Sequence, residues 1–150
     1  MKDKLYQAFV DATNNVFKLM LNISEISAHP TEDFKCNDEI DISIGIVGDL
    51  NGEVIYRFPV ETSLNMVNIM SGMQFEEVDA FVTSAISEVA NIISGNVLTA
   101  ISANNLKCDI LPPVQCKLDK DKEYEMETSC CIITKIGEIC LEIRLNQMLS

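Results

Sequence analysis

A carboxylate and an amide stand three residues apart, as Glu88 and Asn91, in a long segment that lacks charged residues otherwise. Residues at this spacing are neighbours on the surface of a helix. At about 100° per residue, Ser84, Glu88, Asn91 and Gly95 fall within about 60° of one another. These four residues therefore predict one narrow polar stripe along the helix. Ser87 lies at its border, and the small residues leave room for a second surface to approach closely.

The residue types limit what chemistry this stripe can do. Asn is neither a nucleophile nor a base, and the only histidine, His29, lies far away in the sequence, which disfavours a Ser-His-Asp or Cys-His arrangement. No glycine-rich phosphate loop is present. An amide can hold a water molecule in line with a phosphorus atom, as the water-positioning Gln of GTPases does. A carboxylate can pair with a lysine of another protein, so the stripe suits half of a composite site. The alternative is an ordinary solvated helix face.

The helix that must carry the stripe is predicted from about residue 80 to Ala103. Its opposite side is apolar at helical spacing and is expected to face the core. Glu76, Glu77 and Asp79 precede it, where acidic residues favour a helix N-terminus. Gly95 costs such a helix about 1 kcal/mol relative to Ala, which suggests a packing or docking reason for it. The predicted core positions are Val82, Ile86, Val89, Ile93, Val97 and Ala100.

The rest of the chain predicts an α+β fold in which helices cover an antiparallel sheet. Apolar residues recur at helical spacing over 3–21 and again over 62–71, and they alternate along 40–46, 53–58, 124–132 and 139–145. Less regular strands are expected over 23–28 and over 107–116, the latter interrupted by Pro112 and Pro113. Segments 31–38 and 117–122 are predicted turns. The order of elements suggests one domain, 1–150, built from two similar halves, about 1–60 and 61–150.

Charge and cysteine content narrow the class of protein. With 11 Lys and Arg against 23 Asp and Glu, the net charge of −12 disfavours nucleic acid and anionic membranes as partners. No uninterrupted apolar run approaches about 20 residues, and the start of the chain lacks a signal-peptide pattern, so we expect a cytoplasmic protein. The six cysteines lack metal-ligand spacing and are expected to be mainly reduced and structural. Because neighbouring strand residues face opposite ways, Cys130 or Cys131 is predicted to be exposed and open to oxidation.

The sequence resembles the CheX branch of the CheC/CheX/FliY family of bacterial chemotaxis phosphatases. The family signature is Asp or Ser, then Glu four positions later, then Asn three further, then Pro some twenty residues on. Ser84, Glu88 and Asn91 match it, followed by Pro112 and Pro113 at about the expected distance. Residues 11–17, 44–52 and 70–73 also resemble the branch, so the similarity extends over nearly the whole chain.

This resemblance implies a CheC-like duplicated α/β fold and dephosphorylation of a phosphorylated CheY-like response regulator. In that case Asn91 orients the attacking water, Glu88 pairs with a lysine of the regulator, and Ser84, Ser87 and Gly95 contact it. The protein needs no cofactor of its own, because the Mg²⁺ belongs to the regulator. A homodimer is also implied.

Two alternatives remain for the function of the stripe, and the first helix carries a separate expectation. The stripe is instead a non-catalytic docking surface for a regulator or a flagellar switch protein, or it is the subunit interface of a structural dimer. The first helix carries Asp11, Asn14 and Asn15 in place of a Glu and Asn pair. Since Asp is one methylene shorter than Glu, this half is expected to lack a working site.

Overall fold

The computed structural model describes residues 2–24, 26–30, 39–103, 105–115 and 124–147. Three helices and seven strands follow one another along the described chain. They are α1 (Lys2–Leu21), β1 (Ser27–Pro30), β2 (Glu39–Gly48), β3 (Leu50–Pro59), α2 (Val60–Ser71), α3 (Ala80–Ser102), β4 (Cys108–Ile110), β5 (Val114–Gln115), β6 (Met126–Thr134) and β7 (Gly137–Gln147).

All strands join one antiparallel sheet in the order β1-β6-β7-β3-β2-β4, with β5 also paired to β2. Two long hairpins, β2–β3 and β6–β7, meet at the centre through β3 and β7. The short strands lie outside them, and each pairs with the hairpin from the other half of the chain. The α+β arrangement is therefore confirmed, while an internal duplication remains a prediction.

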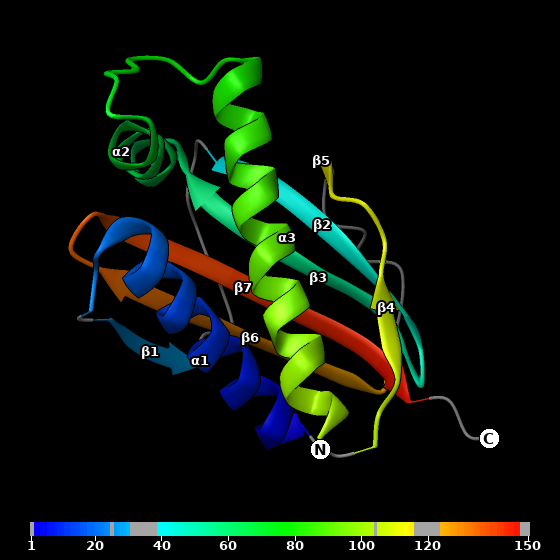
Figure 1. Ribbon diagram of the computed structural model, residues 1–150. Coiled ribbons are helices and arrows are strands. Elements are labelled where there is room, and N and C mark those ends of the chain that lie inside the picture. Colours follow the sequence, from blue (N-terminus) through cyan, green and yellow to red (C-terminus); the bar gives the residue numbers. More distant parts are fainter. Residues whose placement is uncertain (1, 25, 31–38, 104, 116–123, 148–150) are drawn as a thin grey trace.

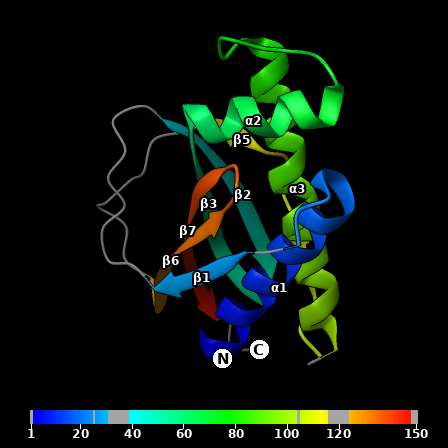
Figure 2. The ribbon, with the colours of Figure 1, turned by 90° about the vertical axis from the view of Figure 1, so that its left-hand side faces the viewer.

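Helices α1 and α3 lie on the same face of the sheet and pack against each other (Figure 1). Seen from the side, the sheet forms one layer and these two helices the next, with α2 crossing at one end (Figure 2). The main core lies between the layers. Alternating strand residues enter it from both hairpins, as their pattern predicts. They include Ile40, Ile42, Ile44, Ile46, Val54, Tyr56, Phe58, Ile139, Leu141, Ile143 and Leu145.

The predicted elements match the structure closely, with differences at their ends. Strand β1 begins at Ser27 rather than at Ile23. The backbone N–H of Ile23 instead donates a hydrogen bond to the carbonyl of Phe17 in α1, and the Ile23 side chain is buried. Helix α2 begins at Val60, directly after Pro59, and ends at Ser71, and its C-cap Gly72 has the left-handed conformation. The predicted turns over 31–38 and 117–122 lie outside the described residues.

The expectation that Cys130 or Cys131 is exposed is wrong. The two side chains do face opposite sides of β6, but both are buried. The Cys131 thiol donates a hydrogen bond to Glu138 Oε2 at 3.1 Å. Burial raises the pKa of each thiol to about 12, so both are protonated at neutral pH and poor nucleophiles. Cys108, Cys130, Cys131 and Cys140 form no disulfide among the described residues, and Cys36 and Cys116 lie outside them.

Helix α3 is long and apolar enough, by length and composition, to cross a membrane. It does not appear as an uninterrupted apolar run in the sequence, because Glu88 and other polar residues divide it. This is weak evidence for a span, because core helices of soluble proteins meet the same criterion, and one side of α3 packs on the sheet and on α1.

Candidate functional site

Helix α3 begins with a side-chain cap. Asp79 has an extended backbone, and its carboxylate accepts a hydrogen bond from the backbone N–H of Val82 at 2.9 Å. This satisfies one of the free N–H groups of the first turn. Glu76 and Glu77 were expected at the same helix start, but they lie in the preceding loop, so Asp79 alone of the three caps the helix.

The buried side of α3 sets which residues face outward. Val82, Ile86, Val89, Ile93 and Val97 are buried as predicted. Ala100 was expected on this core-facing side but is exposed, and Ile101 is buried instead. The buried side of the helix is therefore rotated slightly at its C-terminal end. Ser94 is also buried, and its hydroxyl bonds to that of Tyr56 on β3.

The predicted polar stripe lies on the outward side of α3. Ser84 and Glu88 are exposed, while Ser87, Asn91 and Gly95 are half-buried. Ser87 donates a hydrogen bond to the carbonyl of Thr83 at 2.8 Å and is thereby held against its own helix. Within the described residues, the side chains of Ser84, Glu88 and Asn91 have no hydrogen-bond or ion-pair partner. The carboxylate and the amide are therefore available to a partner.

No contact within the described chain requires the Gly95 of the stripe to be glycine. A Cβ atom added at this position meets no atom within 4 Å, and the residue has ordinary helical backbone geometry. Packing within the chain therefore does not require glycine here. The cost of Gly in a helix, about 1 kcal/mol, is therefore not offset by any contact within the described chain that needs glycine.

One flank of α3 is formed by the segment that carries the two prolines. Strands β4 and β5 both pair with the outer edge of β2, and Pro112 and Pro113 lie between them. The backbone N–H of Leu111 bonds to the carbonyl of Gly45 at 2.8 Å, and this segment runs beside α3 (Figure 1). The edge position expected for a strand with two prolines is confirmed.

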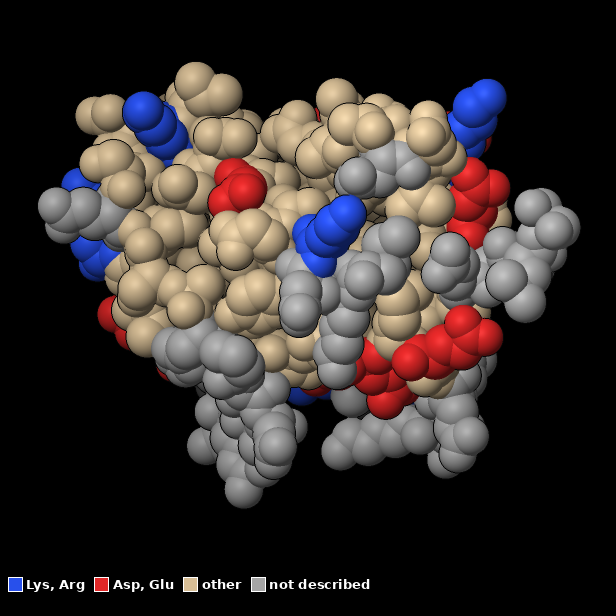
Figure 3. Space-filling view, turned by 90° about the horizontal axis from the view of Figure 1, so that it is seen from below, with Lys and Arg blue, Asp and Glu red and all other residues tan. Residues whose placement is uncertain are grey.

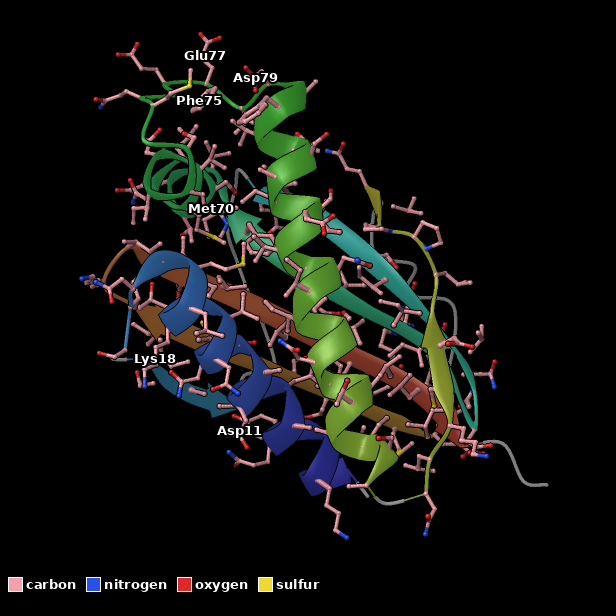
Figure 4. All side chains as sticks on the ribbon, viewed as in Figure 1. Asp11, Lys18, Met70, Phe75, Glu77 and Asp79 are labelled. Carbon is pink, nitrogen blue, oxygen red and sulfur yellow. The ribbon has the colours of Figure 1, made fainter. Side chains whose placement is uncertain are left out.

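Helix α1 presents a different set of groups. Asp11 is exposed and accepts a hydrogen bond from Gln7 at 2.8 Å, and Asn15 is exposed beside it. Asp11 and Lys18 both project from the outer side of α1 (Figure 4). The Oδ1 atom of Asn14 is buried and has no partner among the described residues. Because the Asp11 carboxylate already accepts a hydrogen bond from Gln7, α1 does not reproduce the unpartnered carboxylate and amide of α3.

In the described part of the chain, no group of three or more His, Cys, Asp or Glu side chains is placed to hold a metal ion. The stripe on α3 contains one carboxylate and one amide. This donor set can orient water or pair with a cation of a partner.

Comparison with known proteins decides the family. The family model described as chemotaxis phosphatase CheX matches residues 40–136. This chain belongs to the CheX family. Over 71 residues it is 37% identical to the CheY-P phosphatase CheX of Thermotoga maritima. That alignment covers 47% of this chain and 46% of the relative, so the match spans about half the length of the relative.

Solved structures confirm the fold. A CheC-like superfamily protein from Shewanella sp. PV-4 superposes with a TM-score of 0.80 at 21% identity, over 97% of this chain and 99% of that one. The CheX chain in a CheX–CheY–BeF3–Mg²⁺ complex from Borrelia burgdorferi superposes with a TM-score of 0.74 at 22% identity, over 95% and 97%. At these identities the similarity establishes the fold alone, and the CheC-like fold class predicted from the sequence is confirmed.

The structure also shows a feature near the stripe that the sequence pattern did not single out. The rings of Phe75 and Phe81 stack with centroids 5.2 Å apart and an interplanar angle of 11°. The sequence could have indicated Phe81 as a neighbour of the stripe, because it lies about 20° around the helix from Glu88 and two turns before it.

Proposed function

We propose that this CheX-family protein hydrolyses the aspartyl phosphate of a phosphorylated CheY-like response regulator. The observation that carries the proposal is the pair Glu88 and Asn91. They project from the outward side of α3, one turn apart, without partners in the described residues, in a chain of the CheX family. The likeness to a relative named CheY-P phosphatase supports the same substrate.

The proposed roles follow from the chemistry of the two side chains. The Asn91 amide donates one hydrogen bond to a water molecule and accepts another from it, which holds the water in line with the phosphorus atom. The water oxygen bonds to phosphorus while the bond from phosphorus to the acyl oxygen breaks. The products are inorganic phosphate and the free aspartate carboxylate, and the proton released from water passes to the solvent or the phosphate.

Glu88 serves engagement in this proposal. Its carboxylate pairs with a lysine beside the phosphate in the regulator, while Ser84, Ser87 and Gly95 provide small contacts on either side. The Mg²⁺ is that of the regulator. A cytoplasmic location, where response regulators act, belongs to the same proposal.

The test is a decay assay. A CheY-like regulator is phosphorylated with a small phosphodonor, and phosphate release is followed with and without the protein. We expect wild type to accelerate decay and Asn91→Ala to abolish the acceleration. Asn96→Ala provides a matched control, because Asn96 is an exposed asparagine of the same helix about 120° from Ser84. Equal acceleration by wild type and Asn91→Ala refutes the role of Asn91.

Two further outcomes address the other predictions. Binding of the phosphorylated regulator without faster decay indicates a non-catalytic docking module. A homodimer remains a prediction, and its interface has to leave the stripe accessible. A dimer in which Glu88 and Asn91 are buried between subunits contradicts the phosphatase proposal, and spin labels or cross-linkers placed at Ser84 report on it.

A further inference from the structure

An exposed aromatic pair lies at the N-terminal end of α3. Phe81 is 54% exposed, and its ring stacks on that of Phe75, which is packed at the margin of the core. Phe75 and its neighbours Glu77 and Asp79 lie together above the first turn of α3 (Figure 4). A large exposed aromatic ring of this kind is typical of residues that dominate protein interfaces.

The loop that carries Phe75 is held at both ends by hydrogen bonds. The backbone N–H of Phe75 donates to Asn68 Oδ1 at 2.6 Å, and the backbone N–H of Gly72 donates to the Asn68 carbonyl at 3.0 Å. At the other end, Asp79 caps α3 through Val82. The ring pair is thus ordered before any partner arrives, so docking on it costs little conformational entropy.

The position of Phe81 places it within reach of any protein seated on Glu88. The two residues are seven positions apart, which is about 10.5 Å along the helix and about 20° around it. A specific protein interface covers about 800 Å² on each partner, equivalent to a disc with a radius of about 16 Å. A regulator whose interface is centred on Glu88 and Asn91 therefore covers Phe81 as well.

The charged residues that neighbour the pair along the chain are of one sign. Residues 58–106 contain no Lys or Arg, while Glu76, Glu77 and Asp79 are exposed beside the rings. At the opposite end of the molecule, the view from below shows basic and acidic side chains both present at the surface (Figure 3). The α2–α3 end thus combines an apolar anchor with negative charge, and it complements an apolar pocket bordered by basic residues.

Resting on the proposed function, we infer that the Phe75–Phe81 pair is a second docking point for the phosphorylated response regulator. It selects regulators that present an apolar pocket flanked by Lys or Arg near the phosphorylated aspartate. Glu88 and Asn91 act at the phosphate, and the aromatic pair supplies affinity and choice of partner about two helical turns away. Phe81 is accordingly a specificity-determining residue and touches no reacting atom.

The experiment measures affinity and turnover separately for Phe81→Ala and Phe81→Leu. Affinity is measured by calorimetry with a regulator held in its phosphorylated form by beryllofluoride. We expect Phe81→Ala to weaken binding about tenfold and Phe81→Leu to weaken it less, with an unchanged decay rate at saturating protein. Leu19→Ala is the control, because Leu19 is 83% exposed on α1. Thermal melts verify that each variant is folded.

The outcomes separate this inference from the function on which it rests. If wild type accelerates the decay of no regulator, the proposed function is wrong. If wild type is active and Phe81→Ala binds with wild-type affinity, the docking point is wrong while the phosphatase stands. A drop in turnover at saturation without a change in affinity also contradicts the inference, because it places Phe81 at the chemical step.

Discussion

The hydroxyl oxygens of Tyr56 and Ser94 lie 2.7 Å apart in the core, where they join β3 to the buried side of α3. Ser94 is about 120° around the helix from Glu88. Together with the apolar side of α3, this hydrogen bond therefore holds the rotation of the helix on the sheet, and with it the outward direction of Glu88 and Asn91. Burial raises the pKa of the Tyr56 hydroxyl, so it stays protonated at all ordinary pH values.

We expect Tyr56→Phe to lower the free energy of unfolding by about 1–3 kcal/mol, because it leaves the Ser94 hydroxyl buried without a partner. Ser94→Ala leaves the tyrosine hydroxyl in the same state and has a similar cost. The double variant is expected to lose less than the sum of the two, as measured by urea denaturation. Ser84→Ala, at an exposed position of the same helix, provides the control. Additive losses contradict the coupling.

Glu88 and Asn91 are expected to affect different kinetic quantities. Asn91→Ala lowers the decay rate at saturating protein about 100-fold, because the water loses its alignment. Glu88→Gln raises the concentration needed for half-maximal decay about tenfold, because the charge pair with the regulator is lost. A titration of protein against phosphorylated regulator separates the two. Glu61→Gln is the control, since Glu61 is exposed on α2. If both variants alter only the half-maximal concentration, Asn91 has no role in the chemical step.

Gly95→Ala is expected to stabilise the protein and impair engagement. The added methyl group meets open space, so the helix gains about 0.5–1 kcal/mol and the melting temperature rises by about 2–4 °C. Gly72→Ala is the matched comparison, because its Cβ also meets open space but its φ of +70° makes Ala unfavourable. Weaker binding of the regulator by the stabilised Gly95→Ala variant indicates close approach at this position. Unchanged binding removes the docking explanation for Gly95.

Ionisable side chains on the sheet face opposite the helices are expected to make stability depend on pH. Arg57 bonds to Glu142 at 3.2 Å and lies 3.6 Å from Glu39, with Asp41 directly opposite on β2. Burial, and next the charge of Asp41, raise the pKa of Glu39. Because its folded-state pKa lies above the unfolded value, the contribution of Glu39 to stability is full below the unfolded pKa and is lost as pH rises through the folded pKa.

Glu39→Gln removes this titration. We expect the variant to be more stable than wild type at neutral pH, with the difference disappearing near pH 4, about the pKa of an unfolded glutamate. Urea denaturation between pH 4 and 8 measures it, and Glu61→Gln again serves for comparison. A variant that is less stable at neutral pH shows that the Arg57 pair outweighs the cost of burial.

Local pattern predicted most of the elements and the face of α3, because helix and strand periods determine which side chains can be buried together. It could not predict that Cys131 is buried, since that depends on what covers the second face of the sheet. Nor could it predict the exposure of Ala100, because the burial of a last helical turn depends on its neighbours.

The Phe75–Phe81 pair shows a second limit of prediction from the sequence. Phe81 stands near the stripe on the helix, but only the folded loop brings Phe75 against it. Such a contact depends on the path of residues 72–79, which carry no periodic signal. Glu88 and Asn91, in contrast, were predictable because one regular helix fixes their relation.

The interleaved strand order also has a consequence during synthesis. Strand β1 is made early, yet Ser27 pairs with Ile133 near the other end of the chain. On the ribosome, the N-terminal segment therefore waits for β6 to emerge before that edge of the sheet can close. Such distant pairing is slow, because the entropy of loop closure is lost before the contact is gained. Nascent chains cut short before β6 are expected to remain incompletely folded and to be substrates for chaperones.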